Sequence, residues 1–150
     1  MGELSLVEVL GLIPHRPPFR FIDTLVELDD VHVMAKYTFR PEAFFYGGHF
    51  PGNPITPGVI LTEAMCQMGL LPLGIRALSK EAPEAKSLVT VLTDAETEYY
   101  RPVLPGTTVI CRGKKIYWRR RKIRARLELT DLEGNLLAAG SAAGIGVTVG

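Results

Sequence analysis

Cysteine is scarce in this chain of 150 residues, which contains only Cys66 and Cys111. Cys66 falls in an apolar, helix-like run and Cys111 in a strand-like run, so both are expected to be reduced core residues. A disulfide-stapled secreted scaffold is thereby disfavoured, and a reducing compartment, the cytoplasm, is expected. Residues 1–16 also lack the basic segment that opens a secretory signal.

Uncharged apolar runs of membrane-spanning length are lacking too. The longest apolar run, residues 58–80, contains Glu63, Gln67, Pro72 and Arg76. Charges at membrane depth are costly, so we expect a buried helix and no membrane association. A hydrophobic content of 47% with 22% charged residues is typical of a globular protein, and the length suits one domain over residues 1–150.

Acidic residues are absent from residues 112–126, "RGKKIYWRRRKIRAR", which hold nine of the 17 basic residues. The rest of the chain therefore has eight basic against 16 acidic residues. Three interpretations stay open for this stretch: a solvated hairpin, a docking surface for an anionic protein, or nucleic-acid binding through Tyr117 and Trp118. No recognised nucleic-acid motif accompanies it, so we expect no nucleic acid as partner.

Hydrophobic periodicity predicts one short helix, two strands, one long helix and then strands only. The short helix covers residues 4–12, and the first strands lie within 20–30 and 31–40. Thr56 is expected to cap the long helix with Pro57 in its first position, and Pro72 to kink or end its first part. Later strands are predicted near 87–95, 97–103, 107–118, 122–131 and 135–148.

The long helix is apolar on all sides, so it must be covered on every side. A curved antiparallel sheet wrapped around it would do so, which predicts an α+β fold. Polar residues in this helix are therefore informative. Glu63 and Gln67 are four residues apart and share a face. A carboxyl group in apolar surroundings either pairs with a cation or acts as an acid with a raised proton affinity.

A loop of glycines and prolines precedes this helix and contains His49. The glycines permit close approach and the prolines stiffen the loop, which would present the imidazole as a positioned base. His15 and His32 are interpreted as ordinary turn residues. Gly58 lies near the helix start, where its backbone N–H has no helical acceptor and could bind an oxyanion. Base, acid and oxyanion donor together suit β-elimination from a carbonyl compound.

Three segments carry a resemblance: "IPHRPPFRFID", "GHFPGNPITPGVILTEAMCQ" and "YYRPVLPGTTV". They resemble the 3-hydroxyacyl-[acyl carrier protein] dehydratases of type II fatty acid synthesis, over nearly the whole chain. The resemblance implies the hotdog fold, no cofactor, no metal and a homo-oligomer, either a dimer or a trimer of dimers. It also implies that acyl carrier protein is the partner and that Arg119, Arg120, Arg121 and Lys122 dock it.

In that family His49 would be the catalytic base and Glu63 the catalytic acid, contributed by two different subunits. The Gly58 N–H would bind the thioester carbonyl, and the Ile55 carbonyl would orient the imidazole. Gln67 and Phe50, in the same block, are expected to contact substrate. Two other functions stay open, a hotdog acyl thioesterase and a non-catalytic acyl-binding subunit. The complete set of His49, Gly58 and Glu63 argues against the second.

Overall fold

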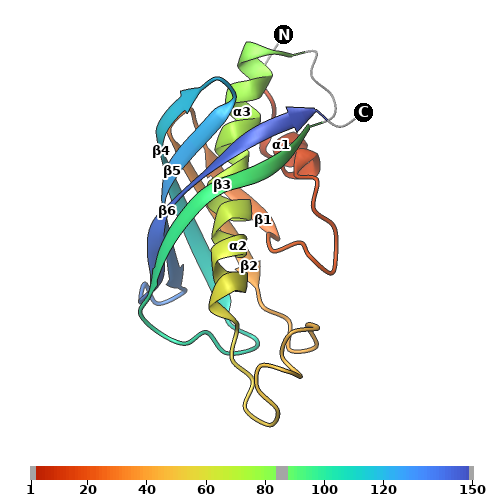
Figure 1. The fold of residues 1–150 in the computed structure, drawn as a ribbon, viewed down its shortest axis with the longest axis vertical. Coiled ribbons are helices and arrows are strands. Elements are labelled where there is room, and N and C mark those ends of the chain that lie inside the picture. The colour runs from red at the N-terminus through yellow and green to blue at the C-terminus, as the bar shows by residue number, and fades with distance from the viewer. Residues whose placement is uncertain (1–2, 84–87, 149–150) are drawn as a thin grey trace.

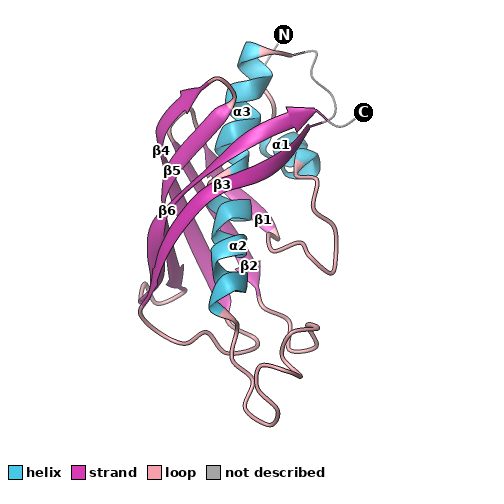
Figure 2. Ribbon diagram, viewed as in Figure 1, coloured by secondary structure: helices cyan, strands magenta, loops and turns pink. Residues whose placement is uncertain are grey.

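The computed structural model describes residues 3–83 and 88–148. They form a curved antiparallel sheet wrapped around a helical rod (Figures 1 and 2). The sheet order is β1-β2-β4-β5-β6-β3. Three helices and six strands are described: α1 (Leu6–Leu12), β1 (Thr24–Leu28), β2 (His32–Thr38), α2 (Gly58–Gly69), α3 (Leu71–Glu81), β3 (Leu88–Tyr99), β4 (Thr108–Arg119), β5 (Lys122–Asp131) and β6 (Leu136–Thr148). The predicted arrangement of a long central helix inside a curved sheet is therefore confirmed.

The strands follow the period-2 pattern wherever one face is buried. In β2 the side chains of Val33, Ala35 and Tyr37 are buried while those between them are not. Alternation of this kind puts every second side chain on the face that covers the helix. The sequence pattern therefore set which face of β2 packs inward.

The prediction of separate strands at 87–95 and 97–103 was wrong. Residues Leu88–Tyr99 form one strand, β3, which pairs with β6 from Leu88↔Thr148 to Tyr99↔Ala138. A polar segment that includes Asp94 and Glu96 resembles a turn in the sequence, but a register shift between Leu92 and Asp94 keeps it in the sheet. Such a bulge absorbs an extra residue without ending the strand.

Two helices, α2 and α3, form the nearly continuous rod at the centre. The chain changes from α2 to α3 at Leu70, and Pro72 lies at the start of α3, as the sequence predicted. Residues 58–81 have the length and apolar composition of a membrane span, but 67% of the most apolar window is buried inside the molecule. Their apolar surface thus packs against this protein's own sheet.

Close contact between rod and sheet depends on two glycines. A Cβ atom built on Gly113 in β4 would lie 2.1 Å from the carbonyl oxygen of Gly69 in α2. No side chain fits there, so the backbone of the helix rests directly on the strand at this point. The neighbouring thiols of Cys66 and Cys111 are both free and buried, and burial raises the pKa of Cys66 to about 12. The prediction of reduced core cysteines is confirmed.

The N-terminal segment closes one side of the rod. Ser5 caps α1 through a reciprocal pair of hydrogen bonds with Glu8. After α1, residues 13–23 form an irregular connection with a turn at 17–19, where the Phe19 N–H donates to the Arg16 carbonyl at 2.9 Å. Phe21 and Ile22 in this stretch are buried, and the Phe21 N–H donates to the Gln67 side chain. The segment between α1 and β1 thus reaches the polar positions of the central helix.

Candidate functional site

The loop that carries His49 is fixed mainly by its own backbone. The His49 N–H donates to the carbonyl of Phe45 at 3.1 Å, and the Ile55 N–H donates to the carbonyl of His49 at 2.9 Å. At the loop's base, the hydroxyl groups of Tyr46 and Thr56 are 2.6 Å apart and buried. Burial also raises the pKa of Tyr46 above its ordinary value. The loop is thus a rigid support.

The role predicted for Thr56 as helix cap was wrong. Pro57 occupies the cap position of α2, with no side-chain cap hydrogen bond. The Thr56 hydroxyl pairs with Tyr46 instead, while its N–H donates to the carbonyl of Val103 at 2.9 Å. A buried hydroxyl needs a partner, and the tyrosine satisfies it better than an exposed helix end would. Gly58 therefore becomes the first residue of α2.

The imidazole of His49 is oriented by a backbone carbonyl. Its Nδ1 lies 2.8 Å from the carbonyl oxygen of Ile55, which can only accept a hydrogen bond. Nδ1 must therefore carry the proton, so the neutral ring has its free electron pair on Nε2. Phe50, half exposed, stacks on the imidazole with 4.1 Å between ring centroids. A base with one fixed tautomer and one fixed plane results.

Gly58 shares a hollow with the histidine. A hollow of about 360 Å³ is lined by His49, Ile55, Gly58 and Tyr99 among others. The Gly58 N–H, at the first position of α2, has no acceptor within the described residues. A Cβ at residue 58 would lie 3.0 Å from the Tyr99 ring, so a larger residue would push this ring away from the helix start. The arrangement leaves a free donor and a free base beside one cavity.

Glu63 is held from its own helix. Its Oε2 accepts a 2.8 Å hydrogen bond from the Gln67 amide, one turn further along α2. That amide also donates to the Phe19 carbonyl at 3.1 Å, and its oxygen accepts from the Phe21 N–H at 2.6 Å. Gln67 is fully buried, and its amide hydrogens are used by the protein. Gln67 therefore links Glu63 to the N-terminal segment, and the substrate contact expected of it stays a prediction.

The interpretation of His15 as an ordinary turn residue was wrong. Its Nε2 lies 3.6 Å from Oε2 of Glu63, and the two side chains are only 22% and 21% exposed. Burial lowers the pKa of His15, as do nearby Arg20 and Arg16, whereas Glu63 raises it. Sequence reasoning missed this residue because the contact joins positions 48 apart. The only available signal was the proline-flanked block "IPHRPPF" that contains it.

His32 differs from His15 in its exposure and in its place in the fold. It begins β2 and is exposed, and its Nδ1 lies 3.5 Å from Oδ1 of Asp29 across the β1–β2 turn. The interpretation of His32 as a turn residue is one position off, since His32 is the first residue of the strand that follows the turn.

His49 and Glu63 are not joined within one chain. The hollow beside His49 is not lined by Glu63. Glu63 instead contacts Gln67 and His15, and within the described residues no hydrogen bond or ion pair links it to His49. The structure thus brings His49, Ile55 and Gly58 together and leaves Glu63 in a second cluster on the same helix.

The predicted docking cations lie at the β4–β5 hairpin. Arg120 and Arg121 form its two-residue turn with φ of 50° and 61°, a left-handed conformation that non-glycine residues rarely adopt. Arg119 lies over the Tyr117 ring at 4.6 Å. Within the described residues, Arg119, Arg120, Arg121 and Lys122 form no ion pair. In a single chain this hairpin and the His49 loop occupy opposite ends of the molecule (Figure 1).

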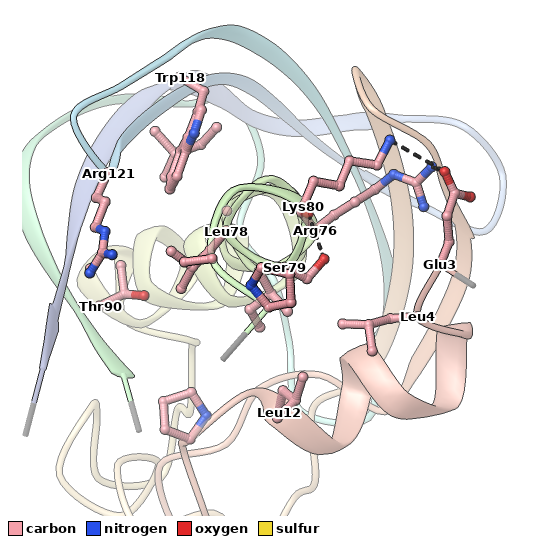
Figure 3. Close-up of a pocket in the computed structure, with 17 residues that line it drawn as sticks. Glu3, Leu4, Leu12, Arg76, Leu78, Ser79, Lys80, Thr90, Trp118 and Arg121 are labelled. Atoms are coloured by element: carbon pink, nitrogen blue, oxygen red, sulfur yellow. Dashed lines mark hydrogen bonds and ion pairs between the residues drawn. The ribbon is translucent and has the colours of Figure 1, made fainter. Parts of the chain in front are cut away.

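A larger cavity, of about 710 Å³, surrounds one side of α3. Figure 3 shows it between α3, α1 and the sheet, with Leu78 and Leu12 facing the space, Trp118 above it and Arg121 at the left. Glu3 binds Arg76 and Lys80 at its rim. The lining is mostly apolar and its volume falls in the range of ligand pockets. Pro14 lines the same cavity, so the space adjoins the segment that carries His15.

The chain is similar in sequence to known proteins over most of its length. A family model described as "FabA-like domain" matches residues 13–139. The chain is 31% identical to the 3-hydroxyacyl-[acyl-carrier-protein] dehydratase FabZ of Herpetosiphon aurantiacus over 140 residues, which cover 91% of this chain and 94% of that protein.

Solved structures agree on the fold. The dehydratase heterocomplex ApeI:P from Xenorhabdus doucetiae aligns with a TM-score of 0.76 and 17% identity, covering 93% of this chain and 91% of that one. Thioesterase HI1161 from Haemophilus influenzae aligns with a TM-score of 0.68 and 15% identity, covering 98% and 93%. These likenesses bear on the fold alone, and the predicted hotdog fold is confirmed. The chain belongs to the FabA-like family, alongside the FabZ 3-hydroxyacyl-[acyl-carrier-protein] dehydratases.

Proposed function

We propose that this protein dehydrates 3-hydroxyacyl thioesters carried on acyl carrier protein to trans-2-enoyl thioesters. One observation carries the proposal: His49 has its Nε2 electron pair free beside the unpaired N–H of Gly58. A base next to an oxyanion donor suits removal of a proton α to a carbonyl. Membership of a family with named dehydratases supports the same reaction.

The chemistry divides between three groups. His49 Nε2 takes a proton from C2, and the Gly58 N–H binds the thioester oxygen as negative charge develops there. The C3–O bond breaks, and the hydroxyl leaves as water with a proton from Glu63. The double bond forms between C2 and C3. Water is lost with no net oxidation or reduction, so the step requires no redox cofactor.

We place His49 and Glu63 of one site in two protomers. Strand β3 is an edge strand, twelve residues long, and its side chains from Val91 to Glu96 are exposed. Val59, on the first turn of α2, is 76% exposed. A long free edge beside exposed apolar residues is a surface that proteins usually cover. Antiparallel pairing of two β3 strands would cover it and set the rod of one copy beside the hollow of the other.

The same pairing of β3 strands would determine where the carrier protein docks. Two-fold antiparallel pairing would bring one copy's β4–β5 hairpin to the end where its partner's His49 loop lies. The cations Arg119, Arg120, Arg121 and Lys122 would then face an acidic carrier that delivers its thioester there. Opposite charges of this kind speed the encounter more than they raise affinity. The free cysteines agree with the proposed cytoplasmic location.

We assign the acyl tail to the large cavity beside α3. The cavity is apolar and adjoins the segment next to Glu63, so a chain with C3 at Glu63 could continue into it. Replacing Leu78 by Trp should fill part of the space and lower kcat/KM for long acyl chains relative to short ones. Leu132→Trp, on an exposed turn outside the cavity, is the matched control. Equal loss at all chain lengths would contradict this assignment.

Turnover of 3-hydroxyacyl thioesters by the purified protein tests the reaction. Enoyl thioester should form from carrier-bound substrates, with a shift in ultraviolet absorbance. His49→Ala and Glu63→Gln should each lower kcat by about 10²–10⁴-fold, the usual contribution of a general acid or base. Release of free thiol without enoyl product would identify a thioesterase instead. Acyl binding with neither product would identify a binding subunit.

Complementation between variants tests the shared site. Co-expressed His49→Ala and Glu63→Gln chains form mixed dimers in which one site is intact and the other carries both changes. Such dimers should recover up to half of the wild-type activity, while each variant alone stays inactive. No recovery in isolated mixed dimers would show that each chain supplies both groups to its own site. Sedimentation velocity gives the oligomer size, expected as a dimer or a trimer of dimers.

A further inference from the structure

The carboxyl group of Glu63 is contacted on one oxygen only. Gln67 donates to Oε2 at 2.8 Å, and His15 Nε2 lies 3.6 Å from the same atom. Within the described residues, Oε1 has no hydrogen-bond partner. The two oxygens of this carboxyl group are therefore in different environments.

The protonation of His15 follows from its other nitrogen. Nδ1 is buried and, among the residues that the structure describes, has no hydrogen-bond partner. A buried N–H without an acceptor costs the full desolvation of a donor, so Nδ1 is better left unprotonated. The proton of the neutral ring then sits on Nε2, the nitrogen that faces Glu63.

The groups around His15 favour the neutral ring. Arg16 and Arg20 lie on the same segment, and both donate to backbone carbonyls, including that of His15 itself. From the central helix only Glu63 faces the ring with charge. Two nearby cations and partial burial oppose a third positive charge, and burial lowers the pKa of His15 as expected.

We infer that His15 is a positioning residue for Glu63: together with Gln67 it holds Oε2 and leaves Oε1 as the oxygen that carries the transferred proton. This inference rests on the proposed dehydratase function. A proton on Oε2 would face the Gln67 N–H, which donates to that atom at 2.8 Å, and the His15 N–H 3.6 Å away, so it is excluded from that atom. Oε1 thus protonates the leaving hydroxyl. The carboxylate that remains is stabilised at Oε2 by the His15 and Gln67 N–H groups.

The inference gives the segment before β1 a function. Glu63 has three rotatable side-chain bonds and could adopt several rotamers. His15 and Gln67 approach it from the segment and from α2, and Gln67 is itself tied to Phe19 and Phe21. The segment thus fixes the acid by contacts far apart in sequence, and misplacement of the acid would lower the rate of the chemical step.

Steady-state kinetics of His15 variants form the first test. His15→Phe keeps the ring volume without the donor, and His15→Gln returns an N–H near the Nε2 position. We expect kcat to fall about 10–100-fold in His15→Phe with KM unchanged, a loss of the size produced by misplaced catalytic groups. His15→Gln should recover most of it. His32→Phe, a change at the exposed histidine, should match the wild type.

A double-mutant cycle separates positioning from general damage. If His15 acts through Glu63, then His15→Phe should cause no further loss in a Glu63→Gln background. An equal loss in both backgrounds, or wild-type kcat in His15→Phe, would overturn the inference. Absence of turnover in the wild-type protein would instead overturn the proposed function.

Nitrogen-15 NMR of the imidazoles provides a measurement that does not depend on turnover. The chain has three histidines, so His32→Phe and His15→Gln assign the signals. His15 should show the neutral Nε2–H tautomer near neutral pH, and its signal should move in Glu63→Gln. A protonated ring, an Nδ1–H tautomer, or a signal unaffected by Glu63→Gln would each overturn the inference.

Discussion

His49 and Glu63 are held by different kinds of contact. The carbonyl that orients His49 comes from Ile55, six residues away in the same loop. Glu63 is held by Gln67 and His15, and Gln67 is itself bound to the segment before β1, 46 and 48 residues away. His49 is therefore organised locally, whereas the position of Glu63 depends on how the N-terminal segment packs against the central helix.

Substitutions near His49 and near Glu63 should therefore have different effects. Changes in the His49 loop should act on one side of the reaction and on local stability. Changes in the Glu63 cluster should disturb both the acid and the attachment of a whole segment to the rod. Three substitutions measure the difference, and a fourth, Asp30→Asn, lies outside both clusters; they follow from the largest expected effect to the smallest.

Gln67→Met should have the largest combined effect. It removes the donor to Glu63 and leaves the buried Phe21 N–H and the partly buried Phe19 carbonyl without their Gln67 partner. We expect the free energy of unfolding to fall by about 2–4 kcal/mol, since each buried unsatisfied group costs about 1–3 kcal/mol. Denaturant unfolding measures this loss, and kcat should fall as well. Met68→Leu, a volume-conserving change at the next buried residue, is the control.

The hydrogen-bonded hydroxyls of Tyr46 and Thr56, at the base of the His49 loop, should contribute less to the free energy of unfolding. Thr56→Val leaves the buried Tyr46 hydroxyl unpaired and should lower the free energy of unfolding by about 1–3 kcal/mol. The double variant Tyr46→Phe/Thr56→Val removes both hydroxyls and should lose less than the single change. If the double variant were the less stable of the two, the hydroxyls would have partners other than each other. Thermal unfolding of the wild type, the single variant and the double variant measures these differences.

Phe50→Ala should affect activity rather than stability. The ring is half exposed and stacks on His49, an interaction worth about 0.5–1.5 kcal/mol, or about 2–10-fold in rate. Phe44→Ala removes another exposed ring of the same loop that does not stack on the imidazole, and should leave kcat unchanged. Equal effects of the two changes would show that Phe50 acts through the loop and not through the imidazole.

Asp30→Asn should have the smallest effect and none on turnover. Asp30 binds Lys80 and Arg76 of α3, and these hydrogen bonds lower its pKa from 3.8 to about 2. A lowered pKa in the folded state stabilises the fold above the ordinary value, and this stabilisation is lost as the pH falls through about 2. The difference in melting temperature from wild type should therefore be present near neutral pH and vanish in acid.

Salt provides a second check on Asp30. The ion pairs of Asp30 with Arg76 and Lys80 are near the surface. High salt should therefore reduce the difference in melting temperature between Asp30→Asn and wild type. Glu133→Gln, at an exposed turn, is the charge-matched control. A difference that persists in acid or at high salt would mean that Asp30 stabilises the fold by something other than these ion pairs.

Local features of the sequence predicted much of the site. The glycines and prolines around His49 indicated a rigid loop, and the family resemblance placed the Ile55 carbonyl against the imidazole, where the structure has it. Thr56 was misjudged because a good capping residue was adjacent to Pro57, while its real partner, Tyr46, lies ten residues earlier. The joined strand β3 was missed because only pairing with β6 keeps its polar residues in the sheet.

By itself the sequence determined the fold class, the buried helix and the types of residue present for acid–base chemistry. Period-2 and all-round apolar patterns are local, and they follow from the need to bury one face of a strand and every side of a central rod. The tertiary structure alone decided that His15 reaches Glu63, that Gln67 donates to Glu63, and that Glu63 and His49 occupy separate clusters in one chain. Such contacts join distant positions, and packing in three dimensions, not local pattern, selects them.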